Sequence, residues 1–149
     1  MKTVLFSLSI CLLFGCGTRK ISGDGTGQTI EMKAAKKTSA SLGKSQVSTN
    51  TTVIRDVRID GNALSIDVSY SGGCEDHFFE LVGNEAISKS LPPLRSVRLV
   101  HTGTQDLCKA MILKTLEFDL SALAYKQEAG SEIILNLEGW DQQIRYVFK

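Results

Sequence analysis

Seven short segments of β-strand character, spaced along residues 51–149, constrain the fold more than any other feature. The clearest is residues 64–70, where apolar side chains alternate strictly with Ser65, Asp67 and Ser69, as in a strand with one buried face. The others are predicted at 52–60, 77–82, 96–102, 109–120, 132–138 and 142–148. Turn-forming residues such as Gly61 separate them, and we find no long amphipathic helix. The sequence therefore predicts an all-β fold, an antiparallel β-sandwich of about seven strands of the immunoglobulin-like type.

Residues 1–15 have the pattern of an export signal. A basic start is followed by a mostly apolar stretch over residues 4–14, which falls well short of the ~20 apolar residues needed to span a bilayer. Leu13, Gly15 and Cys16 resemble the lipobox of bacterial lipoproteins, with an apolar residue, a small residue and the cysteine that is modified. The resemblance implies that a lipoprotein signal peptide is removed before Cys16 and that Cys16 carries acyl chains such as palmitate. A secretory signal without lipidation is the alternative.

Residues 16–50 predict a flexible basic tether between the lipidated cysteine and the sandwich at 51–149. The stretch is rich in Ser, Thr, Gly and Lys, so it cannot bury enough apolar surface to offset the entropy of ordering the chain. Its basic side chains suit contact with anionic lipid headgroups, and a linker that is only solvated is the alternative. We therefore expect a protein anchored in the bacterial cell envelope. Gly17, found where an inner-membrane retention signal would place Asp, favours the outer membrane over the inner membrane.

Two cysteines and two histidines lie together in the predicted domain. Cys74, His77, His101 and Cys108 fall within 35 consecutive residues. In the oxidising compartment beyond the inner membrane, a pair of thiols is usually bonded, which predicts a Cys74–Cys108 disulfide that stabilises the fold by about 3–4 kcal/mol. The alternative is a zinc or copper site that uses all four side chains. The two hypotheses exclude each other, because a bonded cysteine has no thiolate to offer.

Strand parity predicts where the two histidines point. His77 shares the parity of Phe79, and His101 shares that of Leu99, so both imidazoles should face the interior. A buried histidine is more often a hydrogen-bonded core residue than a metal ligand. Asp76, Asp106 or a backbone carbonyl are the partners we expect.

The net charge and the lack of catalytic motifs limit the classes of function that this protein can have. The 17 basic and 16 acidic side chains nearly cancel, which argues against a nucleic-acid partner. The chain has neither a G-x-S-x-G elbow nor an H-E-x-x-H pair, so we predict no enzyme, no catalytic residue and no cofactor. We expect a membrane-anchored binding or structural module whose partner is an envelope protein or a glycan. The alternative is a periplasmic metal-binding protein that holds zinc or copper through Cys74, His77, His101 and Cys108.

The segment around the first cysteine carries a family resemblance. The run YSGGCEDHFFEL at residues 70–81, together with His101 and the DLC that ends at Cys108, resembles a recurring pattern in small bacterial lipoproteins of uncharacterised role. It is similar, more loosely, to the C-terminal β-sandwich of NigD-like lipoproteins. The resemblance covers about 50 residues and implies a lipoprotein that carries a β-sandwich.

Overall fold

Apolar and polar side chains alternate along the strands of this domain. The computed structural model describes residues 36–44 and 47–149, so the predicted signal peptide, Cys16 and most of the predicted tether lie outside the described residues. In β4 (Ala63–Gly72), the side chains of Leu64, Ile66 and Val68 are fully buried, whereas Ser65 and Asp67 between them are partly exposed. The period of two found in the sequence therefore separates the buried face of the strand from its outer face.

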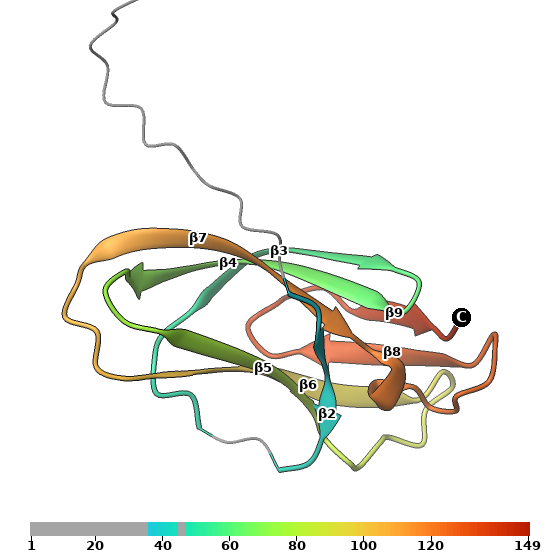
Figure 1. Cartoon of the computed structure of the whole chain (residues 1–149). Helices are drawn as coiled ribbons and strands as arrows, with labels where there is room; N and C mark the ends of the chain where they lie inside the picture. The colour runs from blue at the N-terminus through green and yellow to red at the C-terminus, as the bar shows by residue number, and fades with distance from the viewer. Residues whose placement is uncertain (1–35, 45–46) are drawn as a thin grey trace, which may run out of the picture. The chain divides into compact units, whose positions relative to one another are not determined.

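The strands form two sheets that face each other across an apolar core (Figure 1). Sheet A has the order β1-β7-β4-β3, and sheet B has the order β2-β5-β6-β8-β9. The remaining strands are β1 (Thr38–Ser39), β2 (Ser41–Leu42), β3 (Val53–Asp60), β5 (His77–Gly83), β6 (Leu94–Gly103), β7 (Ala110–Asp119), β8 (Glu132–Leu137) and β9 (Ile144–Val147). A 3-10 turn, η1 (Ser121–Leu123), follows β7. The predicted all-β sandwich is thus confirmed, and each of the seven predicted segments is a strand, β3 to β9.

The sheets are mixed rather than purely antiparallel. Three pairings are parallel: β1 with β7, β2 with β5, and β6 with β8. The last arises because the chain leaves sheet B after β6, runs through β7 in sheet A and returns, so that β8 arrives in the same direction as β6. The purely antiparallel pairing expected for an immunoglobulin-like sandwich is therefore wrong for these three pairs.

The folded domain begins earlier than the predicted boundary at Thr51. β1 pairs with β7 in sheet A and β2 pairs with β5 in sheet B, so residues 38–42 pass from one sheet to the other. Ala40, between the two strands, is buried in the core. The prediction that all of residues 16–50 form a tether is therefore wrong for this part. Main-chain hydrogen bonds hold such short strands, which have no apolar pattern of their own.

The core is filled by large side chains from both sheets. Tyr146 and Phe118 are its two largest fully buried side chains. The Tyr146 hydroxyl donates a hydrogen bond to Asn62 Oδ1 (3.0 Å), so its polar end is satisfied in the β3–β4 turn. None of the residues that the structure describes forms a helix that could cross a bilayer.

Candidate functional site

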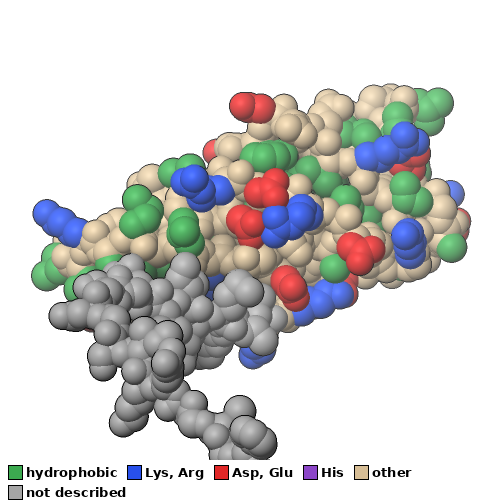
Figure 2. All heavy atoms as spheres, turned by 90° about the horizontal axis from the view of Figure 1, so that it is seen from above, with side chains coloured by type: hydrophobic (Ala, Val, Ile, Leu, Met, Phe, Trp, Pro, Cys, Tyr) green, Lys and Arg blue, Asp and Glu red, His purple; other side chains and the backbone are tan. Residues whose placement is uncertain are grey.

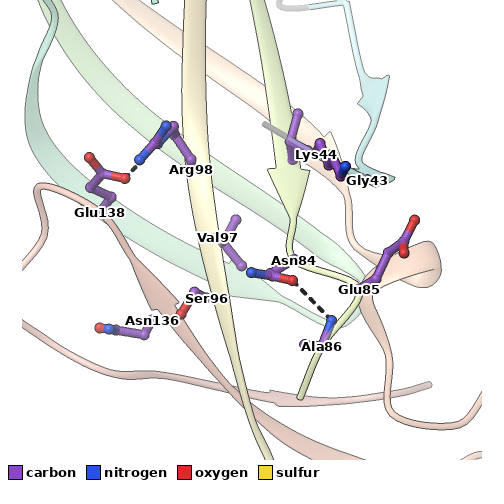
Figure 3. Close-up of a pocket in the computed structure, with 11 residues that line it drawn as sticks. Gly43, Lys44, Asn84, Glu85, Ala86, Ser96, Val97, Arg98, Asn136 and Glu138 are labelled. Atoms are coloured by element: carbon purple, nitrogen blue, oxygen red, sulfur yellow. Dashed lines mark hydrogen bonds and ion pairs between the residues drawn. The ribbon is translucent and has the colours of Figure 1, made fainter. Parts of the chain in front are cut away.

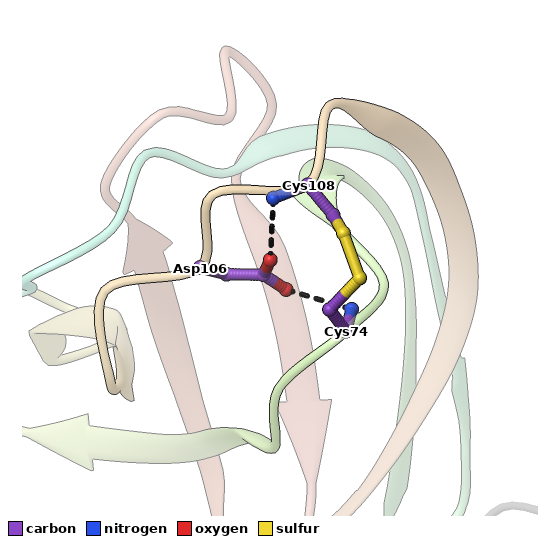
Figure 4. A group of neighbouring side chains, drawn as sticks. All are labelled: Cys74, Asp106 and Cys108. Atoms are coloured by element: carbon purple, nitrogen blue, oxygen red, sulfur yellow. Dashed lines mark hydrogen bonds between the residues drawn. A yellow bond between two sulfur atoms is a disulfide. The ribbon is translucent and has the colours of Figure 1, made fainter.

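Cys74 and Cys108 are joined by a disulfide at one end of the sandwich (Figure 4). Cys74 lies in the loop after β4, and Cys108 lies in the loop that leads into β7. Their Cα atoms are 5.9 Å apart. The predicted disulfide is therefore confirmed, and it ties together two loops that are 34 residues apart in the sequence.

The carboxylate of Asp106 organises the two loops around the disulfide. It accepts hydrogen bonds from the backbone N–H groups of Gly73 (2.8 Å), Cys74 (3.0 Å), Glu75 (3.1 Å) and Cys108 (2.8 Å). Although burial raises the pKa of this carboxyl, the N–H donors of Cys108 and Cys74 outweigh that effect and hold the pKa well below its usual range. Asp106 is therefore a fixed anion that both loops fold around.

A chain of side-chain hydrogen bonds runs from Asp106 into the core. His77 Nε2 lies 3.1 Å from Asp106 Oδ2, His77 Nδ1 lies 2.9 Å from His101 Nε2, and His101 Nδ1 lies 2.6 Å from Thr52 Oγ1. Because the carboxylate only accepts, His77 donates to it through Nε2. We call Thr52, His77, His101 and Asp106 the histidine network.

Aromatic rings enclose His101. Its ring is stacked on Phe79 (centroids 4.2 Å apart, planes at 20°), and the Tyr70 ring lies edge-on with its centroid 5.0 Å away. Burial lowers the pKa of His101 to about 4, and the neighbouring side chains of His77 and Lys114 act in the same direction. His101 is therefore neutral at neutral pH.

The backbone of His101 also holds the segment that enters β3. Its carbonyl accepts hydrogen bonds from the N–H groups of Thr49 (3.0 Å) and Asn50 (3.4 Å), and its N–H donates to Ser48 Oγ (3.1 Å). With the bond to the Thr52 side chain, residues 48–52 are thus fastened to β6. The histidine network therefore joins three parts of the chain: the segment before β3, the β5–β6 hairpin and the disulfide loops.

Gly72 permits the close approach of the loop to the network. A Cβ atom at this position would lie 2.5 Å from His77 Nε2 and 2.8 Å from Asp106 Oδ2. No side chain fits there without displacing the two groups. This glycine is therefore required by the network, through its lack of a Cβ.

The histidine network is closed to solvent and satisfied. The side chains of His77 and Asp106 are 4% and 2% exposed, and His101 is 1% exposed. Within the described ranges, no buried side-chain nitrogen or oxygen lacks a hydrogen-bond partner. A general base or nucleophile must reach its substrate, whereas these groups bind one another and the main chain of the surrounding loops. The geometry therefore supports a structural role for this cluster, which fixes the loops at one end of the sandwich.

The residues of the metal hypothesis lie close together but are already engaged. Both sulfurs are in the disulfide, so neither is a thiolate. The set of ligand atoms within 4.8 Å of one another comes from Cys74, Asp106 and Cys108, and does not include the histidines. A site built from Cys74, His77, His101 and Cys108 would therefore require reduced protein in another arrangement. That hypothesis stays a prediction.

Sequence reasoning identified part of the network. The predicted inward orientation of both histidines is confirmed, and Asp106, one of the expected partners, binds His77. Asp76 is exposed instead. Thr52 was missed, because nothing in its local sequence marks it as the partner of a residue 49 positions away. The pairing of the two histidines follows from their shared parity on neighbouring strands, since His101 lies opposite Phe79 in the β5–β6 ladder.

A second feature is an open polar cavity of about 640 Å³ on the outer side of sheet B (Figure 3). Arg98 and Glu138 form an ion pair at its wall, and Asn84 Oδ1 accepts a hydrogen bond from the N–H of Ala86 (2.9 Å). Gly43 and Lys44, just after β2, form the other side. Several of its polar groups are thus already paired with one another.

Comparisons with known proteins support the fold. No family model matches the sequence, and no curated protein is similar to it. Among solved structures, the chain is similar to a NigD-like immunity protein from Bacteroides caccae, with a TM-score of 0.60 and 12% identity over 77% of this chain and 65% of that one. It is also similar to a protein of unknown function, DUF1344, from Bacteroides vulgatus, with a TM-score of 0.50 and 14% identity over 77% of this chain and 57% of that one. The chain spans less than two thirds of the length of either structure. Its fold is loosely that of a NigD-like protein.

Proposed function

We propose that this protein is a lipid-anchored module of the bacterial cell envelope that binds a partner protein and performs no catalysis. The Cys74–Cys108 disulfide is the observation that carries the export half of the proposal, because such bonds persist in oxidising compartments and are rare in the cytosol. The signal pattern that ends at Cys16 points to the same compartment. The structural likeness to a NigD-like immunity protein is compatible with a non-enzymatic role.

Metabolic labelling tests the anchor. The full chain, expressed in a bacterial host, should incorporate radiolabelled palmitate, and the variant Cys16→Ala should not. In the wild type, thiol titration of the unfolded protein without reductant should find no free thiol from Cys74 or Cys108. Unlabelled protein with residues 1–15 still attached, or free thiols at both positions, would contradict the export proposal.

The binding half of the proposal rests on the free edge of β7. One side of β7 is paired with β4 from Ala110 to Asp119, but the other side is paired with β1 only at Phe118 and Asp119. Main-chain groups of residues 110–117 on that side have no strand beside them within the described part of the chain. Met111 and Leu113 are 72% and 61% exposed on the outer face of the same strand. Figure 2 shows hydrophobic side chains of this face among scattered charges.

An exposed edge of this kind supports binding of a polypeptide. A partner strand that pairs with the edge gains main-chain hydrogen bonds, and exposed side chains give the pairing its specificity. A glycan gains no such ladder. We therefore favour the protein partner over the glycan, and we call residues 110–117 the open edge.

Photo-crosslinking in living cells tests the open edge. A photoreactive amino acid in place of Met111 should give an adduct that runs as a protein of higher mass. The matched control is Ile59, an exposed apolar residue of β3 on the opposite edge of sheet A. A polypeptide adduct from position 111 and none from position 59 supports the proposal. The absence of an adduct from position 111 contradicts it.

A further inference from the structure

We propose that the partner at the open edge is a second copy of this chain, so that two β7 strands pair antiparallel and join the two A sheets into one. This inference rests on the proposed function, because it names the partner of the same surface. It is carried by three observations: the direction of the free main-chain groups, the self-complementary order of side chains along β7, and the match between the length of the edge and the length of the strand.

The main-chain groups of alternate residues point away from β4. The carbonyl of Asp119 accepts a hydrogen bond from the N–H of Ala40, so Asp119 faces the open side. The N–H of Leu120 donates to the carbonyl of Asn62, so the next residue faces β4. With a period of two, the odd-numbered residues of β7 direct both N–H and C=O toward the open edge. If a two-fold axis passes beside an odd-numbered residue, the free N–H groups of one copy therefore lie opposite the free C=O groups of the other.

Leu113 is the residue at which this pairing is self-complementary. An antiparallel pair centred there sets Leu113 against Leu113 of the second copy and Met111 against its Thr115. In the same register, Lys109 of each copy comes beside Glu117 of the other, which gives two opposite-charge contacts. Met111, Leu113 and Lys109 are all exposed in the single chain, and Glu117 is partly exposed. The pairing thus covers the apolar groups and matches the charges.

The length of the edge fits this register. β7 begins at Ala110, and β1 takes its place beside β7 at Phe118. In a pair centred on Leu113, Ala110 of the second copy lies opposite Leu116, so the incoming strand ends just before the position of β1. A register centred on Thr115 would place Met111 of the second copy opposite Asp119, where Ser39 already pairs. β1 therefore excludes registers centred nearer the C-terminal end of β7.

The symmetry of this pair suits two anchored chains. Neighbouring antiparallel strands are related by a two-fold axis perpendicular to the sheet, so the same face of both A sheets points the same way. The first described residues of the two copies then lie on one side of the dimer. Confinement of both chains to one membrane raises their effective concentration, so a modest affinity suffices for pairing.

Charge exchange tests the register. The full chain, purified in detergent, should form dimers in sedimentation equilibrium. Lys109→Glu sets a carboxylate beside Glu117 of the other copy, and Glu117→Lys sets an ammonium group beside its Lys109. Each single variant should weaken self-association by about tenfold, because two attractive contacts become repulsive. The double variant should recover the wild-type affinity, and a mixture of the two single variants should form mixed dimers.

A backbone variant tests the ladder independently of charge. Leu113→Pro removes an N–H that faces only the open edge, so the bonds between β7 and β4 are kept. It should abolish the dimer, and circular dichroism and the intact disulfide should show that the domain still folds. If that variant does not fold, the charge exchange alone decides.

The outcomes separate this inference from the proposed function. Wild-type protein that stays monomeric, or dimers whose affinity is unchanged in both charge variants, overturn the pairing of two copies. A cross-linked adduct from position 111 with a different protein overturns the dimer but leaves the proposed function intact. The absence of any adduct contradicts both, whereas an adduct of twice the mass of the chain supports both.

Discussion

The histidine network and the open edge adjoin each other along the chain, since Asp106 closely precedes β7, yet they are organised in opposite ways. In the network, the carboxylate of Asp106 accepts five hydrogen bonds, and each histidine nitrogen has a partner inside the molecule. Along residues 110–117, alternate main-chain groups face outward with no strand beside them in the described structure. The difference indicates that substitutions in the network should change folding stability, whereas substitutions at the edge should change association.

Removal of the disulfide should have the largest effect on stability. The double variant Cys74→Ala/Cys108→Ala should lose about 3–4 kcal/mol of unfolding free energy, because the unfolded chain is no longer closed over 34 residues. Denaturation by urea measures this loss. The wild type under reducing conditions is the matched control and should lose a similar amount. A loss of less than about 1 kcal/mol would show that the disulfide contributes little to holding the loops together.

Acidification should destabilise the domain through His101. Its pKa is about 4 in the folded protein and 6.5 when the ring is unperturbed, so between these values the unfolded chain binds a proton that the folded chain does not. The contribution of neutral His101 to the unfolding free energy is fully present above about pH 6.5. As the pH falls toward 4, the unfolding free energy decreases by about 3 kcal/mol through this residue. Unfolding free energies measured at intervals from pH 7 to pH 4 check this loss.

The control for this prediction is His101→Gln, which has no group that titrates in the range. Its stability should be lower at pH 7 but should depend less on pH between 6.5 and 4. The proton resonances of His101 in the wild type provide a direct check, since they should shift only near pH 4. A midpoint near 6.5 in the folded protein would contradict the burial of this ring as the cause.

A matched pair of glycines tests how tightly the network is packed. Gly72 and Gly43 have nearly the same φ, 159° and 158°, but a Cβ at Gly72 meets His77 and Asp106, whereas a Cβ at Gly43 meets nothing within 4 Å. Gly72→Ala should therefore cost about 1–3 kcal/mol more than Gly43→Ala, because only the first displaces buried groups. Thermal unfolding of both variants checks this, and equal costs would mean that the loop relaxes freely around the network.

Much of the histidine network and the disulfide beside it could be predicted from the sequence. Period-two patterns predicted the strands that carry His77 and His101 and the inward direction of both rings, because parity alone decides which face a side chain takes. The disulfide was predicted because an even number of cysteines in an oxidising compartment is usually bonded. These inferences needed only local pattern and simple chemistry.

The remaining features depend on distant contacts. β1 and β2 have two residues each, too few to show a period, and they are held by main-chain bonds to β7 and β5. Thr52 becomes the partner of His101 only when the sheets pack. The parallel pairing of β6 with β8 depends on the path of the chain through β7, which no local pattern encodes. The open edge itself is visible only once the strand order is known.

Polar substitution at the open edge should have the smallest effect on stability and the clearest effect on association. Leu113→Asn replaces an exposed side chain, so the unfolding free energy should change by less than about 0.5 kcal/mol. The side chain nevertheless lies at the centre of the proposed pairing, where Leu113 of one copy meets Leu113 of the other, so self-association in detergent should weaken. Val53→Asn is the matched control, because Val53 is also exposed on the outer face of sheet A but lies on β3, at the opposite edge of the sheet from β7. If both variants lowered self-association equally, the outer face as a whole would be the contact surface, and the open edge would not be the specific site of pairing.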